Sequence, residues 1–268
     1  MELREYAETV VESEDLARKL WRPPGKLTDD APGVARRIPA PGRPPELAIA
    51  PARAVKVPPA AGMRDPAQRA RILHALANHE LQAAEVFAWA LLAFPDAPAK
   101  FRRGLAAITA DEQLHCELYI QRLEEHGHRF GDFPVTGHFW NKLGSIQTPL
   151  HLVCTMGLTF ENANLDFAQE YERAARDAND EDTAEVLETV HSDEVRHVRF
   201  AWHWFGRLKD ERSDDWSTYL ENVAWPLGPG RARGREFDRD SRVAAGLDDA
   251  FIRELENAQP HRPNGRPR

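Results

Sequence analysis

The sequence predicts an all-α protein whose centre is a four-helix bundle, preceded by a proline-rich N-terminal arm and followed by a short helical C-terminal extension. Two observations predict this fold. One pattern, Asp-Glu-x-x-His, occurs twice, at residues 111–115 and at residues 193–197. The stretches that carry it are long and helical in character, with short, long and short links between them, and no strand pattern competes with them. We expect three parts, over residues 1–65, 66–210 and 211–268.

The N-terminal part should hold a short helix and an irregular arm. Residues 2–20 mix apolar and charged side chains in the manner of a short helix, whereas the prolines of residues 22–66 exclude long helices and central strands. Apolar side chains such as Leu47 and Ile49 favour an arm that wraps on the bundle over a flexible leader.

Start and stop signals delimit the four bundle helices. Each of the first three helices begins with a proline that lies one or two residues after an aspartate or a threonine. An asparagine and an aspartate cap the start of the fourth helix, and Gly127 ends the second helix. The predicted helices run over 66–93, from about 98 to 126, over 149–177 and from about 180 to 208. Short links within each pair favour two antiparallel hairpins, and the aromatic loop 128–147 is long enough to cross the end of a bundle.

The C-terminal part should be an extension with two short helices. These are expected near residues 214–222 and 248–257, with an irregular basic segment between them. The last ten residues or so have the composition of a disordered tail.

The repeated pattern also predicts a metal site with two ions. Glutamate and histidine three residues apart share one face of a helix, so both can bind one ion. A further glutamate lies 32 residues before the first pattern glutamate and another lies 33 residues before the second, on the partner helix of each hairpin. The predicted ligands are Glu80, Glu112, His115, Glu161, Glu194 and His197.

The chemistry of these ligands favours iron or manganese. Four carboxylates inside a bundle repel one another, and two divalent cations would cancel their charge. Hard oxygen ligands with two imidazoles suit two iron ions, with manganese an alternative in one or both positions. We hypothesise that Asp111 orients His197 and that Asp193 orients His115, since a metal-bound histidine usually donates its other N–H to an acceptor. The alternative is that both aspartates are solvated.

Other residues offer competing interpretations. Glu-x-x-His also occurs at Glu125 and Glu188, but the first straddles a glycine and the second is turned about 120° from the ligand face. Glu85 is an alternative to Glu80 on the first helix. The arginines of residues 231–235 either bind an anion or solvate a loop.

Several stretches resemble a largely uncharacterised branch of the ferritin-like di-iron carboxylate superfamily. That superfamily includes ferritins, rubrerythrins, the small subunit of ribonucleotide reductase, bacterial multicomponent hydroxylases and a tRNA-modifying hydroxylase. The resemblance covers roughly residues 66–208 and implies the ferritin-like bundle and the metal site, but no substrate. The stretches that carry it are residues 78–85, 94–98 and 160–167, with a further likeness at 231–234 and 237–246.

The expected function is that of an oxidoreductase that activates O2 and acts on an unidentified small molecule, with an electron-donor protein as a candidate partner. The loop 128–147 and the N-terminal arm would cover the bundle, which an iron-storage protein does not need. The alternatives are a ferroxidase, a peroxide-scavenging or iron-handling protein, a protein with a structural metal, and a tRNA-hydroxylase-like enzyme. The last would use a basic patch formed by Arg36, Arg37, Arg43, Arg53 and Lys56.

Charge and composition indicate which partners and which cellular compartment to expect. A formal net charge of −8 argues against nucleic-acid binding by bulk electrostatics. Two cysteines, Cys116 and Cys154, without a CxxC pattern suit a reducing cytoplasm. No apolar run of about 20 residues predicts a membrane span, and the acidic N-terminus does not predict a signal peptide. A homodimer is a reasonable expectation because bundle faces often pair.

Overall fold

The computed structural model describes residues 1–223 and 226–259, and the regular secondary structure of these residues is helical. Within the described ranges there are two isolated β-bridges and no β-strand, which confirms the all-α class. The chain divides into two compact units. The first unit comprises Met1–Gly144 with Ala174–Val186, and the second comprises Ser145–Arg173 with Leu187–Arg268. The three-part division expected from the sequence stays a prediction.

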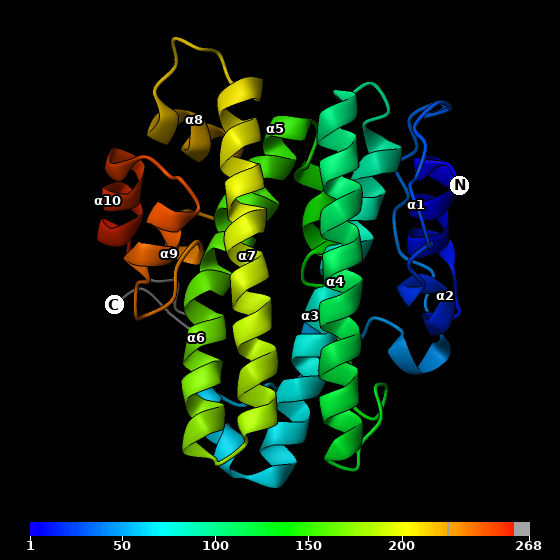
Figure 1. The fold of residues 1–268 in the computed structure, drawn as a ribbon, viewed down its shortest axis with the longest axis vertical. Coiled ribbons are helices and arrows are strands. Elements are labelled where there is room, and N and C mark those ends of the chain that lie inside the picture. Colours follow the sequence, from blue (N-terminus) through cyan, green and yellow to red (C-terminus); the bar gives the residue numbers. More distant parts are fainter. Residues whose placement is uncertain (224–225, 260–268) are drawn as a thin grey trace. The chain divides into compact units, whose positions relative to one another are not determined.

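The first unit is built on two long helices, α3 (Pro66–Ala93) and α4 (Ala99–Glu125), which pack side by side (Figure 1). The start of α3 follows from its sequence, because Asp65 Oδ1 accepts a hydrogen bond from the backbone N–H of Gln68 at 2.9 Å and proline occupies the first turn. Every residue from Glu80 to the end of α3 is buried. This half of α3 therefore lies in the core of the unit.

The N-terminal arm packs on α3. The Arg36 backbone N–H donates to the Leu92 carbonyl at 2.9 Å, and the Trp89 indole N–H donates to the Ile38 carbonyl at 3.1 Å. Leu47 is fully buried, whereas Ile49 is exposed. The helical pieces of the arm are α1 (Leu3–Glu12), α2 (Leu16–Leu20), η1 (Pro45–Leu47), η2 (Ala52–Ala54) and η3 (Ala60–Arg64).

The loop that follows α4 contains the 3₁₀ helix η4 (Trp140–Ser145) and is fixed to α3 by His74. The buried His74 Nε2 accepts backbone hydrogen bonds from Gly131 at 2.9 Å and from Phe133 at 3.4 Å. Burial lowers the pKa of His74 to about 4, so the ring is neutral at pH 7 and can act as an acceptor.

The stretch predicted as one helix over 149–177 is helical throughout but changes type. It consists of α5 (Pro149–Leu152), the π-helix η5 (Val153–Glu161) and α6 (Asn162–Asp177). After a left-handed residue at Asn179 (φ 56°), α7 (Glu181–Leu208) begins. The Asp180 carboxylate accepts the backbone N–H of Thr183 at 3.2 Å, as the predicted cap requires.

The described part of the C-terminal extension contains the two predicted helices, α8 (Asp215–Asn222) and α10 (Asp249–Asn257), and two short helical elements that the sequence does not predict, η6 (Pro229–Arg231) and α9 (Arg239–Ala244). The expected disorder of the last ten residues or so falls mainly on residues 260–268, outside the described residues. Among the described helices, none combines the length and the apolar character that crossing a membrane requires.

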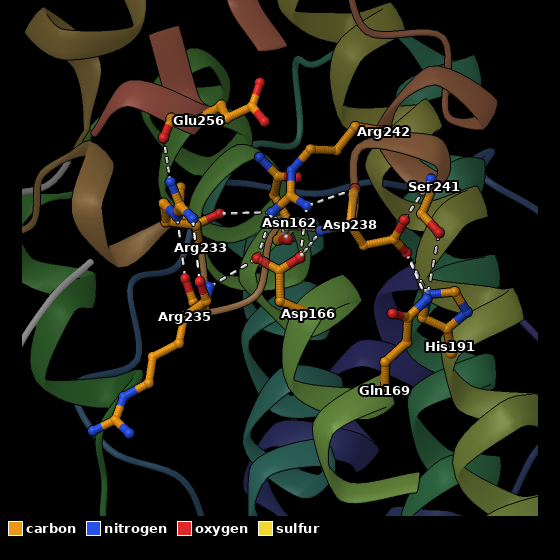
Figure 2. Close-up of polar contacts among 12 residues, drawn as sticks. Asn162, Asp166, Gln169, His191, Arg233, Arg235, Asp238, Ser241, Arg242 and Glu256 are labelled. Atoms are coloured by element: carbon orange, nitrogen blue, oxygen red, sulfur yellow. Dashed lines mark hydrogen bonds and ion pairs between the residues drawn. The ribbon is translucent and has the colours of Figure 1, made fainter. Parts of the chain in front are cut away.

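Asp166 on α6 anchors this extension (Figure 2). Its two carboxylate oxygens lie 2.7 and 3.0 Å from the guanidinium of Arg242, and both side chains are buried. The same carboxylate accepts the backbone N–H groups of Gly234 at 2.8 Å and of Asp238 at 2.7 Å. A Cβ at position 234 would lie 2.9 Å from the Asp166 Cβ, so glycine is required for this close approach. The extension is thus held to α6 by a buried ion pair in which each Asp166 oxygen accepts two hydrogen bonds.

Candidate metal centre

The first unit brings three of the predicted ligands together. Glu80 comes from α3, and Glu112 and His115 come from successive turns of α4. Each offers one ligand atom, these atoms lie within 4.8 Å of one another, and all three residues are buried. His115 Nδ1 lies 3.4 Å from Glu112 Oε2, as the three-residue helical spacing requires. We call Glu80, Glu112 and His115 the first triad.

The second unit brings the other three predicted ligands together in the same way. Glu161 ends η5, and Glu194 and His197 lie on successive turns of α7. Their ligand atoms also lie within 4.8 Å of one another, and all three residues are buried. His197 Nδ1 lies 3.4 Å from Glu194 Oε2 and 3.8 Å from Glu161 Oε2. We call Glu161, Glu194 and His197 the second triad.

The π-helix η5 positions Glu161. An i to i+5 turn is rare and is frequent at functional sites. The Thr159 hydroxyl donates to the Cys154 carbonyl, five residues back, at 2.7 Å and contacts the buried Tyr219 hydroxyl at 2.8 Å. At Gly157 an added Cβ would lie 2.2 Å from the Cβ of Ala201, so glycine lets η5 approach α7 closely. Because Ala201 is one turn beyond His197, this approach sets the spacing within the second triad.

Amide side chains neighbour both triads, and that of Asn164 contacts a ligand candidate directly. Asn164 Nδ2 donates to Glu194 Oε1 at 2.8 Å. Gln113, which follows Glu112, accepts a hydrogen bond from the Tyr6 hydroxyl at 2.6 Å and donates to the Lys19 carbonyl at 2.5 Å. None of these three contacts is predictable from the sequence, because an isolated asparagine, glutamine or tyrosine carries no spacing signal.

Glu85, the alternative to Glu80, has other partners. Its carboxylate pairs with Lys19 Nζ at 3.2 Å and with the Arg43 guanidinium at 2.7 Å, and it accepts the Trp140 indole N–H at 2.8 Å. All three ionic side chains are buried, and burial lowers the pKa of Lys19 against the opposing effect of Glu85. A carboxylate with this many donors is a structural anion, which leaves Glu80 as the ligand candidate on α3.

The other Glu-x-x-His pairs lie apart from the triads. Glu125 pairs with Arg122, and His128 lies 3.5 Å from Asp132. Glu188 is exposed, and its histidine, His191, contacts Asp238. Glu125, His128 and His191 thus have other charged partners, and Glu188 is exposed.

His191, Asp238 and Ser241 form a polar cluster beside the extension (Figure 2), but its geometry does not suit nucleophilic catalysis. Asp238 Oδ2 and Ser241 Oγ both lie 3.2 Å from the same ring nitrogen, His191 Nε2. A general-base histidine needs the serine on one nitrogen and the carboxylate on the other. Burial raises the pKa of Asp238, but hydrogen bonds from His191 and Ser241 outweigh it and hold that pKa well below its usual range. The cluster therefore fixes the extension with a charged carboxylate.

The two pattern aspartates are partly buried. Asp193 pairs with Arg196, one turn further along α7. The proposed roles of Asp111 towards His197 and of Asp193 towards His115 stay predictions.

The donor set of each triad fits a hard divalent cation. Two carboxylates and one imidazole supply oxygen and nitrogen ligands without thiolate, which iron and manganese accept. Removing two carboxylates from water is unfavourable unless a cation compensates their charge, and one divalent ion does so in each triad. Buried Glu and His groups of this kind can hold a metal ion.

Comparison with known proteins gives a family and nothing more specific. Residues 4–253 match the model of a family described as "Protein of unknown function (DUF455)". No curated protein and no solved structure matches the chain.

Proposed function

The chain belongs to the DUF455 family, whose description names no activity, and we propose from its own residues that it is a ferritin-like protein with a dinuclear metal centre. In this proposal the two triads hold two iron ions. The protein uses them to activate O2 and to oxidise a small organic substrate.

The observation that carries the proposal is the match between the triads. Each consists of one glutamate on a first helix and a Glu-x-x-His pair on the next, and each is buried. A doubled set of four carboxylates and two imidazoles is the ligand set of carboxylate-bridged two-metal sites in helix bundles. Chance places a surface Glu-x-x-His easily, but it does not bury two matched copies of it.

The chain's own residues would hold and orient the ions. His115 and His197 would supply the nitrogen ligands, and Glu80, Glu112, Glu161 and Glu194 would supply the carboxylate ligands. Asn164 would fix one oxygen of Glu194 through its 2.8 Å hydrogen bond and leave the other for metal. The reduced ions would supply the electrons for O2 reduction, which no side chain can do. Apolar side chains around the triads, such as Leu81 and Leu158, would exclude water.

The contacts of the basic patch do not favour the tRNA-hydroxylase-like alternative. Arg36 pairs with Glu8 and Glu12, and Arg43 is buried against Glu85. Two of the five basic side chains are thus neutralised, which weakens the feature that favoured RNA binding.

Anaerobic loading with Fe(II) tests the proposal. We expect about two iron ions per chain, and we expect rapid mixing with O2 to give a transient visible absorbance whose decay depends on an added organic compound. Rapid growth of ferric mineral would instead indicate an iron-handling protein. Absence of iron uptake would reject the metal centre itself.

A further inference from the structure

Arg231 is a partly buried cation at the end of η6, the short helix that packs on η5. Its guanidinium carbon lies 5.0 Å from the centre of the Phe160 ring and 5.7 Å from that of Phe167. These rings come from η5 and α6, seven residues apart and on one face of the helix. The guanidinium is therefore fixed against an aromatic surface next to Glu161 in the chain.

Within the described part of the chain, the guanidinium of Arg231 contacts these two rings and has no carboxylate or carbonyl acceptor. The other arginines of this region differ (Figure 2). Arg242 also lies over a ring, at 3.9 Å from Phe237, but it donates to both oxygens of Asp166. Arg233 lies 4.8 Å from the same ring and donates to the carbonyls of Glu256 and Gly234.

A cation that is partly removed from water without a counterion destabilises the folded protein. Burial lowers the pKa of Arg231 to about 10, with no charged neighbour to oppose the effect, and the group is still cationic at pH 7. Contact with two aromatic rings offsets part of this penalty, but it leaves the N–H donors at the edge of the guanidinium available. Such a group is suited to an anionic ligand.

We propose that Arg231 binds the carboxylate of an organic acid whose apolar part lies on the Phe167 side of the guanidinium, and that this acid is the compound oxidised at the metal centre. The planar fork of a guanidinium matches a carboxylate in two parallel hydrogen bonds. A single arginine balances one negative charge, which favours a carboxylate over a phosphate dianion. The inference about the substrate depends on the proposed function, because Phe160 precedes the ligand Glu161 and links the anion site to the second triad.

Calorimetric titration with benzoate, benzamide and inorganic phosphate tests this site in the full-length protein, both metal-free and iron-loaded. We expect benzoate to bind, and benzamide and phosphate to bind at least about tenfold more weakly, because each lacks either the charge or the apolar part. Arg231→Gln should weaken benzoate binding about tenfold or more. Arg233→Gln is the matched control and should change it less than about twofold, because Arg233 has its own acceptors.

Arg231→Lys distinguishes a loss of binding from a loss of folding, because lysine keeps the charge and the aliphatic stem but lacks the planar guanidinium. It should bind benzoate more weakly than the wild type and more strongly than Arg231→Gln, with an unchanged thermal unfolding midpoint. No binding by the wild type, or equal losses in Arg231→Gln and Arg233→Gln, would overturn the anion site. Full iron uptake without Arg231-dependent benzoate binding rejects this inference alone. Benzoate binding without iron uptake rejects the metal centre and leaves the anion site standing.

Discussion

Glu188 and Glu194 lie six residues apart on α7, and each is followed by a histidine three residues later, yet only Glu194 belongs to a triad. The helix turns by about 600° over six residues, which leaves the two side chains on different faces. Glu188 is exposed and Glu194 is fully buried. The face of α7 on which each side chain lies therefore distinguishes Glu194, the ligand candidate, from Glu188, although both belong to the same sequence pattern.

This pair of glutamates gives a matched test of the metal centre. Glu194→Ala should lower the iron content from about two ions per chain to about one or fewer, because it removes one of the proposed carboxylate ligands. Glu188→Ala should leave the iron content unchanged. Metal analysis after gel filtration measures both. Equal iron content in the two variants would contradict the assignment of Glu194 as a ligand.

His74 predicts an acid-sensitive contribution to stability. Its folded-state pKa of about 4 lies below the ordinary 6.5, so the unfolded chain binds the extra proton between these values. The contribution is therefore fully present above pH 6.5 and is lost as pH falls towards 4. The shift corresponds to about 3 kcal/mol in the free energy of unfolding.

Urea unfolding of the wild type and of His74→Gln at pH 7, 5.5 and 4 measures this contribution. Glutamine can accept the same backbone hydrogen bonds but does not titrate, so the difference in stability between the two proteins should shrink or reverse as pH falls. A constant difference across this range would show that His74 does not titrate in the predicted window.

At the scale of the elements, η5 is the segment on which the second triad depends. Gly157→Ala would place a Cβ 2.2 Å from that of Ala201, so η5 and α7 must separate. We expect a loss of about 1–3 kcal/mol in the free energy of unfolding, together with weaker iron binding at the second triad. Chemical denaturation and iron titration measure the two effects.

Gly206→Ala on α7 provides the control for this substitution. An added Cβ there meets no atom within 4 Å, and alanine favours the helix by about 0.5–1 kcal/mol. Gly206→Ala should therefore stabilise the protein slightly and leave iron binding unchanged. If Gly157→Ala behaved in the same way, close approach of η5 to α7 would not determine the triad.

The sequence predicts the long helices well because their ends carry local chemistry. The Asp65 cap with Pro66 and the Asp180 cap each act within one turn, and both are present in the structure. The sequence does not predict the π-helix, because η5 is buried on every side and its apolar run has no periodicity that distinguishes i+5 from i+4 turns. The six-residue helix α9 was missed because it is shorter than the windows in which periodicity is visible.

The six ligand candidates were predictable for a different reason. The spacing to the Glu-x-x-His pair favours Glu80 over Glu85 as a ligand. In the structure, Glu85 forms ion pairs with Lys19 and Arg43. That buried ion cluster was not predictable, because Lys19 and Arg43 lie in the N-terminal arm and no local pattern connects them with α3. Arg231 was named among several arginines, but only coordinates distinguish it from Arg233.

At the scale of the whole molecule, each compact unit carries one triad. In the proposed function each triad binds metal, so metal should stabilise both units against unfolding. We expect calorimetry to give a higher unfolding midpoint with iron than without it. A midpoint that does not respond to iron would contradict metal binding by the triads.

The anchor at Asp166 also bears on how the protein is made. The groups that satisfy this carboxylate follow it by 68, 72 and 76 residues. At ribosomal rates of about 5–20 residues per second, Arg242 is synthesised about 4–15 s after Asp166. The nascent chain thus carries the Asp166 carboxylate without its partners until Arg242 has been synthesised. Messages truncated before codon 242 should yield chains that depend on chaperones and are degraded quickly.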